Sequence, residues 1–160
     1  MSLDHRSLAE LVNCCQAERS AFRSTGERYS PCCMALFRRA CAGDQDAWTE
    51  IVSIFKLLLY KWVNKVKPSL DEHELQTAID DAWLGLSKAC ASNPSLTATG
   101  DLGLTLEYLR KCVRNAVFQF WRKKAKQPYE AALDQALPAA HFSVPDHVFG
   151  TSRISRSLYH

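Results

Sequence analysis

The segment EYLRKCVRNAVFQFWRKKAK, residues 107–126, is the strongest single indication of how this chain folds. It contains neither Gly nor Pro, so no residue in it interrupts a helix. It carries seven Lys and Arg residues, one acid and four aromatic residues. At about 100° per residue, one arc of this helix is apolar and is predicted to face a core. That arc comprises Leu106, Leu109, Val113, Ala116, Val117 and Phe120.

The rest of the same helix, predicted over about 104–126, carries cations, an amide and aromatic rings. Tyr108, Lys111, Asn115, Phe118 and Arg122 fall opposite the apolar arc, with Arg110, Arg114 and Trp121 on one flank. Cations attract phosphates through counterion release, rings stack on unpaired bases and Asn can pair with a base edge. This combination favours an opened strand over an intact duplex. The alternative is an ordinary solvated basic face whose rings cover neighbouring loops.

The remaining chain also shows helical spacing of its apolar residues, over 7–22, 33–43, 44–67 and 69–91. The apolar residues of 44–67, from Trp48 to Trp62, predict a core helix with Asp44 as its N-cap. One face of 69–91 is predicted to be the inner face, comprising Leu75, Ile79, Ala82, Trp83, Leu86 and Cys90. Segments 24–31 and 92–103 are rich in Gly, Ser, Pro and Asn and are predicted to be loops. No repeat and no convincing strand is present. The sequence therefore predicts an all-α compact helical bundle over 31–127, preceded by an N-terminal helical extension over 1–30. Pro128, Pro138 and Pro145 indicate an irregular, flexible tail over 128–160.

Composition limits the class of protein. A chain of 160 residues with 47% hydrophobic content is expected to form one domain with tails, and its net charge of +3 is mild. Seven Cys include the adjacent pairs Cys14-Cys15 and Cys32-Cys33, without zinc-finger spacing. We therefore expect free thiols in a reducing cytosol and no metal or cofactor. No signal peptide and no membrane-spanning run is recognisable, which predicts a cytoplasmic protein without membrane contact.

The sequence gives little support for an enzyme. Its five His are scattered, and His73 lies among acids in a segment typical of a solvated turn. Asp80 and Asp81 are adjacent, so on a helix they point roughly 100° apart and do not converge. No Gly-rich phosphate loop and no nucleophile elbow is present. We expect no catalytic activity.

Three segments in order, ALFRRACAGDQDAWTEIV, TAIDDAWLGL and YLRKCVRNAVFQFWRKK, carry a resemblance to a known family. Together they resemble region 2 of the sigma-70 family of bacterial RNA polymerase sigma factors, in particular the extracytoplasmic-function group. The leading LAELVNCCQAERSAF is similar to the N-terminal extension of a subset of those proteins. The resemblance covers about residues 34–126.

In that family, an A-R-N step followed by L-A-L-D-x-L-R-R forms the helix that contacts the −10 promoter element. Arg114, Asn115 and Arg122 match this pattern, whereas Gln119 replaces the usual Asp. The resemblance implies that this helix binds the melted −10 strand of promoter DNA. The predicted DNA-binding residues are Tyr108, Arg110, Lys111, Arg114, Asn115, Phe118, Trp121, Arg122 and Lys123.

The family pattern D-L-V-Q-E-x-F lies on the helix that docks on the β′ subunit of the polymerase core. Here it reads TAIDDAW, in which Ile79, Asp81 and Trp83 are compatible while Thr77 and Asp80 depart. The departures bear on the strength or partner choice of docking. Leu84, on the outer face, is either part of a docking surface or a lone surface leucine. The predicted polymerase-binding residues are Thr77, Asp80, Asp81 and Leu84.

In the family, the loop matching 92–103 holds a flipped base of the −10 element, and Asn93, Thr97, Thr99 and Asp101 offer hydrogen bonds here. The alternative is a plain connector. No helix-turn-helix resembling the family's region 4 follows residue 127. Three explanations stay open: the chain is a fragment, a partner recognises the upstream element, or the terminal segments are a handle for an anti-sigma protein.

Three hypotheses of function follow. The first is a transcription initiation factor that docks on polymerase core and recognises and melts the −10 element. The second is a sigma-derived helical interaction module, held by an anti-sigma or other regulatory protein, without promoter activity of its own. The third is a nonspecific binder of single-stranded nucleic acid or RNA.

Overall fold

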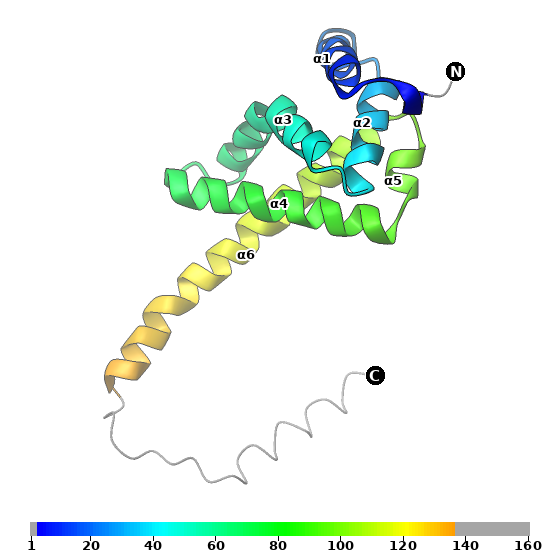
Figure 1. Cartoon of the computed structure of the whole chain (residues 1–160). Helices are drawn as coiled ribbons and strands as arrows, with labels where there is room; N and C mark the ends of the chain where they lie inside the picture. Colours follow the sequence, from blue (N-terminus) through cyan, green and yellow to red (C-terminus); the bar gives the residue numbers. More distant parts are fainter. Residues whose placement is uncertain (1–2, 137–160) are drawn as a thin grey trace, which may run out of the picture. The chain divides into compact units, whose positions relative to one another are not determined.

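The computed structural model describes residues 3–136, and within them the fold is built from helices alone (Figure 1). A 3₁₀ turn, η1 (Leu3–His5), precedes α1 (Leu8–Thr25), α2 (Pro31–Cys41), α3 (Gln45–Val66), α4 (Glu72–Ser92), α5 (Ser95–Ala98) and α6 (Leu102–Ala136). Among the described residues, the extended pairing is a single antiparallel bridge between Tyr29 and Asp101. The predicted all-α fold is confirmed.

Side chains cap the starts of three helices. Asp44 precedes α3 and accepts hydrogen bonds from the amides of Asp46 and Ala47, as its position in the sequence predicts. Ser7 before α1 and Asp71 before α4 each form a reciprocal capping box with the Glu three residues later. These caps satisfy amides that have no partner inside the helix, so the boundaries are set locally.

Two boundaries differ from the sequence prediction. The predicted loop over 92–103 contains the short helix α5, and α6 continues to Ala136 instead of ending near residue 126. Pro128 lies inside α6, where a proline removes one backbone hydrogen bond of the helix. The chain divides into two compact units between Arg122 and Lys123. The rest of the predicted tail, residues 137–160, lies outside the described residues.

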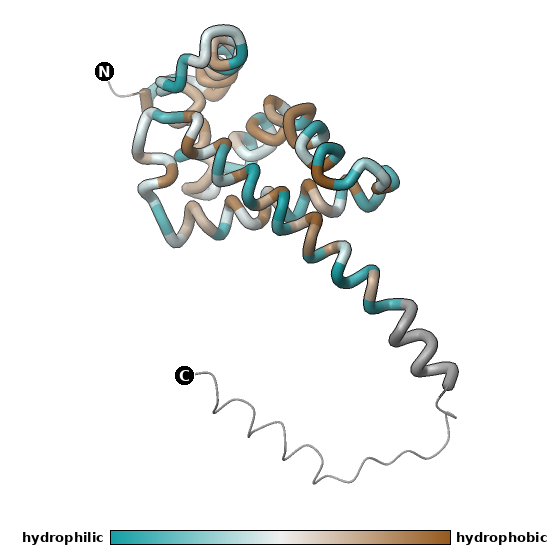
Figure 2. Tube along the Cα trace, turned by 180° about the vertical axis from the view of Figure 1, so that it is seen from behind, coloured by the Kyte–Doolittle hydropathy of each residue, from teal (hydrophilic) through white to brown (hydrophobic). Residues whose placement is uncertain are grey.

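The core of the first unit forms where α2, α3, α4 and the first part of α6 meet. The Phe37 ring of α2 stacks on that of Phe55 of α3, with centroids 5.7 Å apart. One stripe of α6 is buried, and Figure 2 shows hydrophobic and hydrophilic residues alternating along this helix. The buried stripe comprises Leu106, Leu109, Val113, Ala116 and Val117, all predicted, whereas Phe120 is half-buried. The predicted inner face of α4, from Leu75 to Cys90, is also buried.

The cysteines correct one prediction. Cys14 is bonded to Cys32 and Cys15 to Cys33, while Cys41, Cys90 and Cys112 are free. The expectation of seven free thiols is therefore wrong for four of them, because the packing of α1 on α2 brings both adjacent pairs together. The Cα atoms lie 5.7 Å apart in the outer pair and 4.4 Å apart in the inner pair.

Each cross-link closes a loop with a sequence separation of 18, which stabilises a fold by about 3 kcal/mol in the chain-entropy account. The two loops are almost the same loop. The second bond therefore removes little additional freedom from the unfolded chain, and the pair contributes far less than twice the effect of one bond.

Leu57 and Leu59 provide a direct test of this packing, because they lie two residues apart on α3 with opposite exposure. Leu59 is fully buried, whereas Leu57 is 68% exposed. We expect Leu59→Ala to lower the free energy of unfolding by about 2–5 kcal/mol through lost burial and a cavity. Leu57→Ala should change it by less than about 0.5 kcal/mol. Denaturant titrations measure both values, and equal effects would contradict the assigned face of α3.

Candidate nucleic-acid interface

The outward side of α6 carries the predicted DNA-binding residues. Arg110, Lys111, Arg114, Asn115 and Arg122 are exposed, and the Phe118 and Trp121 rings are 40% and 50% exposed. Arg110 and Arg114 lie one turn apart, as do Lys111 and Asn115, so cations and the amide form two neighbouring rows. Lys123 is also exposed but belongs to the second compact unit.

Tyr108 departs from the predicted arrangement. It is half-buried and packs against the core. Its ring also lines a hollow of about 440 Å³ between α5 and α6, to which Leu96, Thr99 and Lys111 contribute. Tyr108 therefore lies in the wall of a hollow rather than on the open face of the helix.

The end of α3 contributes to the same surface, which the sequence prediction missed. A groove of about 380 Å³ separates the two helices. Its walls are Trp62, Lys65 and Val66 of α3 and Glu107, Arg110, Lys111, Val113 and Arg114 of α6. Trp62 continues the apolar spacing of α3; it is half-buried, packs against the core and also lines this groove. Glu107 and Lys111 line both hollows, so the groove and the α5–α6 hollow are adjacent.

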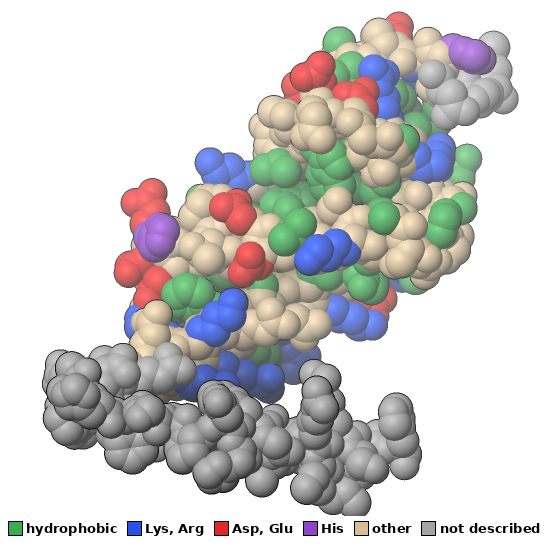
Figure 3. All heavy atoms as spheres, turned by 60° about the horizontal axis from the view of Figure 1, so that its bottom comes forward, with side chains coloured by type: hydrophobic (Ala, Val, Ile, Leu, Met, Phe, Trp, Pro, Cys, Tyr) green, Lys and Arg blue, Asp and Glu red, His purple; other side chains and the backbone are tan. Residues whose placement is uncertain are grey.

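A cation–π contact joins the end of α3 to the aromatic part of α6. The Lys67 ammonium lies 4.4 Å from the centroid of the Trp121 ring. Such a contact is worth about 0.5–1 kcal/mol at an exposed site, so it restrains the half-exposed ring without burying it. Lys65, Lys67 and the cations of α6 make this side of the first unit basic, and Figure 3 shows Lys and Arg side chains gathered along one edge of the face in view.

The polar residues of segment 92–103 are mostly engaged within the protein. Thr97 is buried and its hydroxyl donates to the Pro94 carbonyl. The expectation that Thr97 offers a hydrogen bond to a base is therefore wrong. Asn93 accepts a hydrogen bond from the Ser95 amide. Of the four residues predicted to offer hydrogen bonds, only Thr99 lines the hollow beside Tyr108.

Asp101 instead fixes the start of α6. Its carboxylate accepts from the Arg28 guanidinium at 3.0 Å and from the Leu104 amide at 3.3 Å. The hydrogen bond from Arg28 holds the pKa of Asp101 below its ordinary value, and the Leu104 amide acts in the same direction. Backbone hydrogen bonds from Ser30 to Gly100 and from Leu102 to Arg28 join the same two segments. The start of α6 is therefore tied to the connection between α1 and α2.

The outer side of α4 presents a second, smaller surface. Asp81 is exposed and Leu84 is 52% exposed. The other two predicted polymerase-binding residues have partners within the protein. Asp80 accepts from the Gln76 side chain at 2.8 Å, and the half-buried Thr77 donates its hydroxyl to the His73 carbonyl. Of the four predicted polymerase-binding residues, Asp81 and Leu84 are therefore the main candidates for contact with a partner.

Comparisons with protein families, with curated proteins and with solved structures found no match for this chain. Among residues 3–136, no helix combines the length and the apolar character needed to cross a membrane.

Asp101→Asn tests the ion pair at the start of α6, because Asn retains N-capping ability but loses the charge. A carboxyl whose pKa is lowered by folding stabilises the protein above its ordinary pKa of about 3.9, and this effect is lost as the pH falls through the lower pKa of the folded state. We therefore expect the variant to be slightly less stable than the parent at pH 7, with the gap closing below about pH 4. Denaturant titrations at several pH values measure it, and a gap that is constant with pH would contradict the assignment.

Proposed function

We propose that this chain is a sigma-70-like transcription initiation factor that acts through binding and has no chemistry of its own. In this proposal α4 docks on the β′ subunit of bacterial RNA polymerase core, and α6 holds the melted −10 strand of promoter DNA. The protein then works in the cytoplasm, where polymerase and DNA are found. The order of the three sequence segments and the arrangement of α4 and α6 support it.

The observation that carries the proposal is the mixed surface along α6 and the end of α3. Arg110, Lys111 and Arg114 line a groove, while Phe118 and Trp121 keep about half of their surface exposed. Cations alone suit any nucleic acid, because they bind phosphates without regard to sequence. Exposed rings beside them favour unpaired bases, which duplex DNA does not offer.

The magnitudes agree with a role in strand opening. Separating a base-pair step costs about 1.4 kcal/mol on average, and stacking a base on an aromatic side chain returns about 1–3 kcal/mol. Two rings therefore offset the opening of about two steps. The hollow beside Tyr108 suits one unstacked base, whose extrusion costs a few kcal/mol. Docking on polymerase would supply the remaining free energy by placing this surface on the promoter.

A second candidate function is the interaction module held by a regulatory protein. A small apolar groove of about 120 Å³ lies between α1 and α3, lined by Phe22, Leu57 and Leu58 and bordered by Arg19, Arg23 and Lys61. Leu57 is more exposed than Leu84 and Leu104, the other exposed leucines of the described residues. An apolar groove bordered by cations suits an amphipathic helix that carries acids. This candidate requires no contact with promoter DNA.

Leu84 and Leu57 separate the two candidates, since both are exposed leucines on different helices. Under the leading proposal, Leu84→Glu places a charge in the polymerase contact and should abolish co-purification with core polymerase, whereas Leu57→Glu should retain it. Under the second candidate, Leu57→Glu should abolish capture of the regulatory protein. Affinity purification from native cells measures both. Polymerase retained by Leu84→Glu would contradict the assigned docking surface.

Asn115 tests the promoter contact. We expect Asn115→Ala to lower promoter opening about 5- to 150-fold at equal polymerase binding, because a base contact of this kind is worth about 1–3 kcal/mol. Permanganate reactivity of −10 thymines in a reconstituted transcription reaction measures opening. Arg23→Ala, which removes an exposed cation from α1, is the matched control and should open normally. Full opening by Asn115→Ala would remove the promoter role.

The third hypothesis, a nonspecific binder of single strands, predicts different behaviour. The chain alone would then bind random oligonucleotides, with affinity falling steeply with salt and with no need for polymerase. A promoter-specific factor should show sequence-dependent opening only in the presence of core polymerase.

A further inference from the structure

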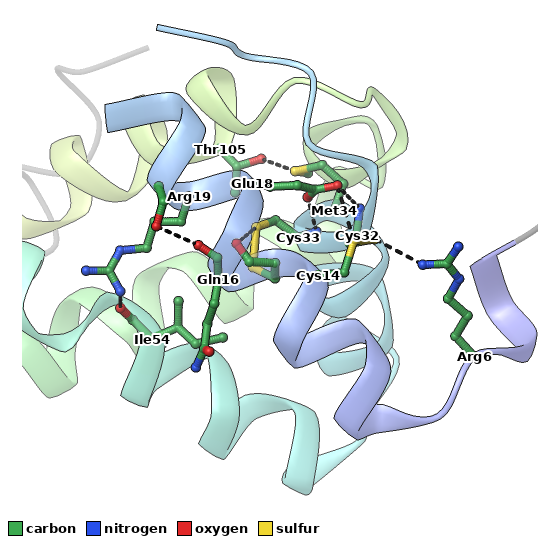
Figure 4. Close-up of a disulfide and its surroundings, with 12 residues drawn as sticks. Arg6, Cys14, Gln16, Glu18, Arg19, Cys32, Cys33, Met34, Ile54 and Thr105 are labelled. Carbon is green, nitrogen blue, oxygen red and sulfur yellow. Dashed lines mark hydrogen bonds between the residues drawn. A yellow bond between two sulfur atoms is a disulfide. The ribbon is translucent and has the colours of Figure 1, made fainter. Parts of the chain in front are cut away.

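Cys14, Glu18 and Cys32 bring two sulfur atoms and a carboxylate together outside the surfaces described above. One potential ligand atom from each lies within 4.8 Å of the other two. Cys14 and Glu18 lie one turn apart on α1, and Cys32 lies in the first turn of α2 (Figure 4). Cys14 and Glu18 are half-buried, so the group is reachable from solvent on the α1 side.

Glu18 is held in place by the backbone of α2. Its two carboxylate oxygens accept hydrogen bonds from the amides of Cys32 at 2.9 Å and Cys33 at 2.8 Å. One of those oxygens lies 3.8 Å from Cys14 Sγ. Metal-binding carboxylates are commonly oriented by such hydrogen bonds, which fix the ligand before the metal arrives. Glu18 therefore has the support expected of a preorganised ligand.

The charges around these three residues also suit the binding of a divalent cation. With both sulfurs as thiolates, the three side chains carry three negative charges against the two positive charges of a divalent cation. The Arg6 guanidinium lies 3.7 Å from Cys32 Sγ and offsets the excess. Two sulfurs and one oxygen suit Zn²⁺, which accepts Cys and Glu ligands and takes water at a fourth position when three protein ligands are present.

We propose that Cys14, Glu18 and Cys32 bind Zn²⁺ when the Cys14–Cys32 bond is reduced, so that one site has two exclusive states. A small-molecule thiolate attacks the Sγ of Cys14, the less buried of the two residues, and releases the Cys32 thiolate. A second small thiol resolves the mixed disulfide, giving the Cys14 thiol and one small-molecule disulfide. Zinc then displaces the remaining thiol protons. Oxidation by a small-molecule disulfide reverses these steps and expels the metal.

The second cross-link does not belong to this site. Cys15 and Cys33 are fully buried, and the Cys33 sulfur lies 3.2 Å from the Cys15 carbonyl oxygen. Solvent reductants reach this pair less readily, so it should hold α1 on α2 while the outer site changes state. The outer position of the α1–α2 junction is then joined by a disulfide under oxidising conditions and by a metal under reducing conditions.

Zinc titration of the full chain tests the proposal. The protein is reduced with a phosphine, freed of reductant without air, and titrated with Zn²⁺ against a chromophoric chelator. We expect one Zn²⁺ per reduced chain and none on the oxidised chain. Cys14→Ser should weaken binding strongly, and Glu18→Gln about tenfold or more. Cys112→Ser, which removes a free thiol of α6, is the matched control and should bind as the parent does.

Two further measurements keep the result unambiguous. Far-ultraviolet circular dichroism checks that each variant remains helical, and Glu18→Gln retains an acceptor for a backbone amide if Cys14→Ser fails to fold. Co²⁺ in place of Zn²⁺ reports sulfur coordination by its absorption. The proposal is overturned if the reduced parent binds no more zinc than Cys14→Ser, or if the oxidised chain binds equally. It is also overturned if Cys15→Ser weakens binding as much as Cys14→Ser, which would indicate a four-sulfur site.

Discussion

Burial of a single stripe along α6 determines where the charged and aromatic residues of that helix lie. Leu109, Val113 and Val117 are buried against the helices around them, and each such side chain stabilises the fold by about 1.5–3 kcal/mol. A surface charge contributes far less, so the apolar stripe sets the rotation of the helix. Because side chains repeat around a helix every 3.6 residues, burying this stripe turns the side chains of Arg110, Arg114 and their neighbours toward solvent.

The first unit keeps its two candidate surfaces on different helices within one packed core. Leu84 projects from α4, whose inner face is buried, and the basic groove lies between α3 and α6. Such cores are densely packed and resist compression. Docking through one surface can therefore position the other without a change of fold, which suits a factor that presents promoter strands to a polymerase.

Regular spacing in the sequence is sufficient to predict α1 to α4 and the first part of α6, including Asp44 as a cap and the inner face of α4, whereas α5 and the far end of α6 were not predicted. The rest depends on contacts between segments distant in the chain. The wall that Trp62 forms with α6 and the bonding of Cys14 to Cys32 both follow from how helices cross. Continuous apolar spacing assigns Trp62 to a core, and adjacent cysteines reveal no partner.

Contacts between distant segments also explain why the sequence did not predict the hydrogen-bond partners of several polar residues. Asp101 and Thr97 read as available hydrogen-bonding groups, yet Arg28 and the Pro94 carbonyl engage them. Glu18 has no recognisable ligand spacing with Cys32, because the amides that orient it come from another helix. Hydrogen bonds between such distant residues cannot be predicted from sequence spacing, because they depend on the three-dimensional arrangement of the backbone.

Photo-crosslinking from position 118 is the most direct test that α6 contacts melted promoter DNA. A photoreactive phenylalanine analogue at Phe118 retains an exposed ring on the outward side of the helix. In complex with polymerase and promoter, it should crosslink to the melted −10 element, and the same analogue at position 57 should not. Absence of any DNA crosslink from position 118 in an active complex, or an equal crosslink from position 57, would contradict the proposed role of this surface.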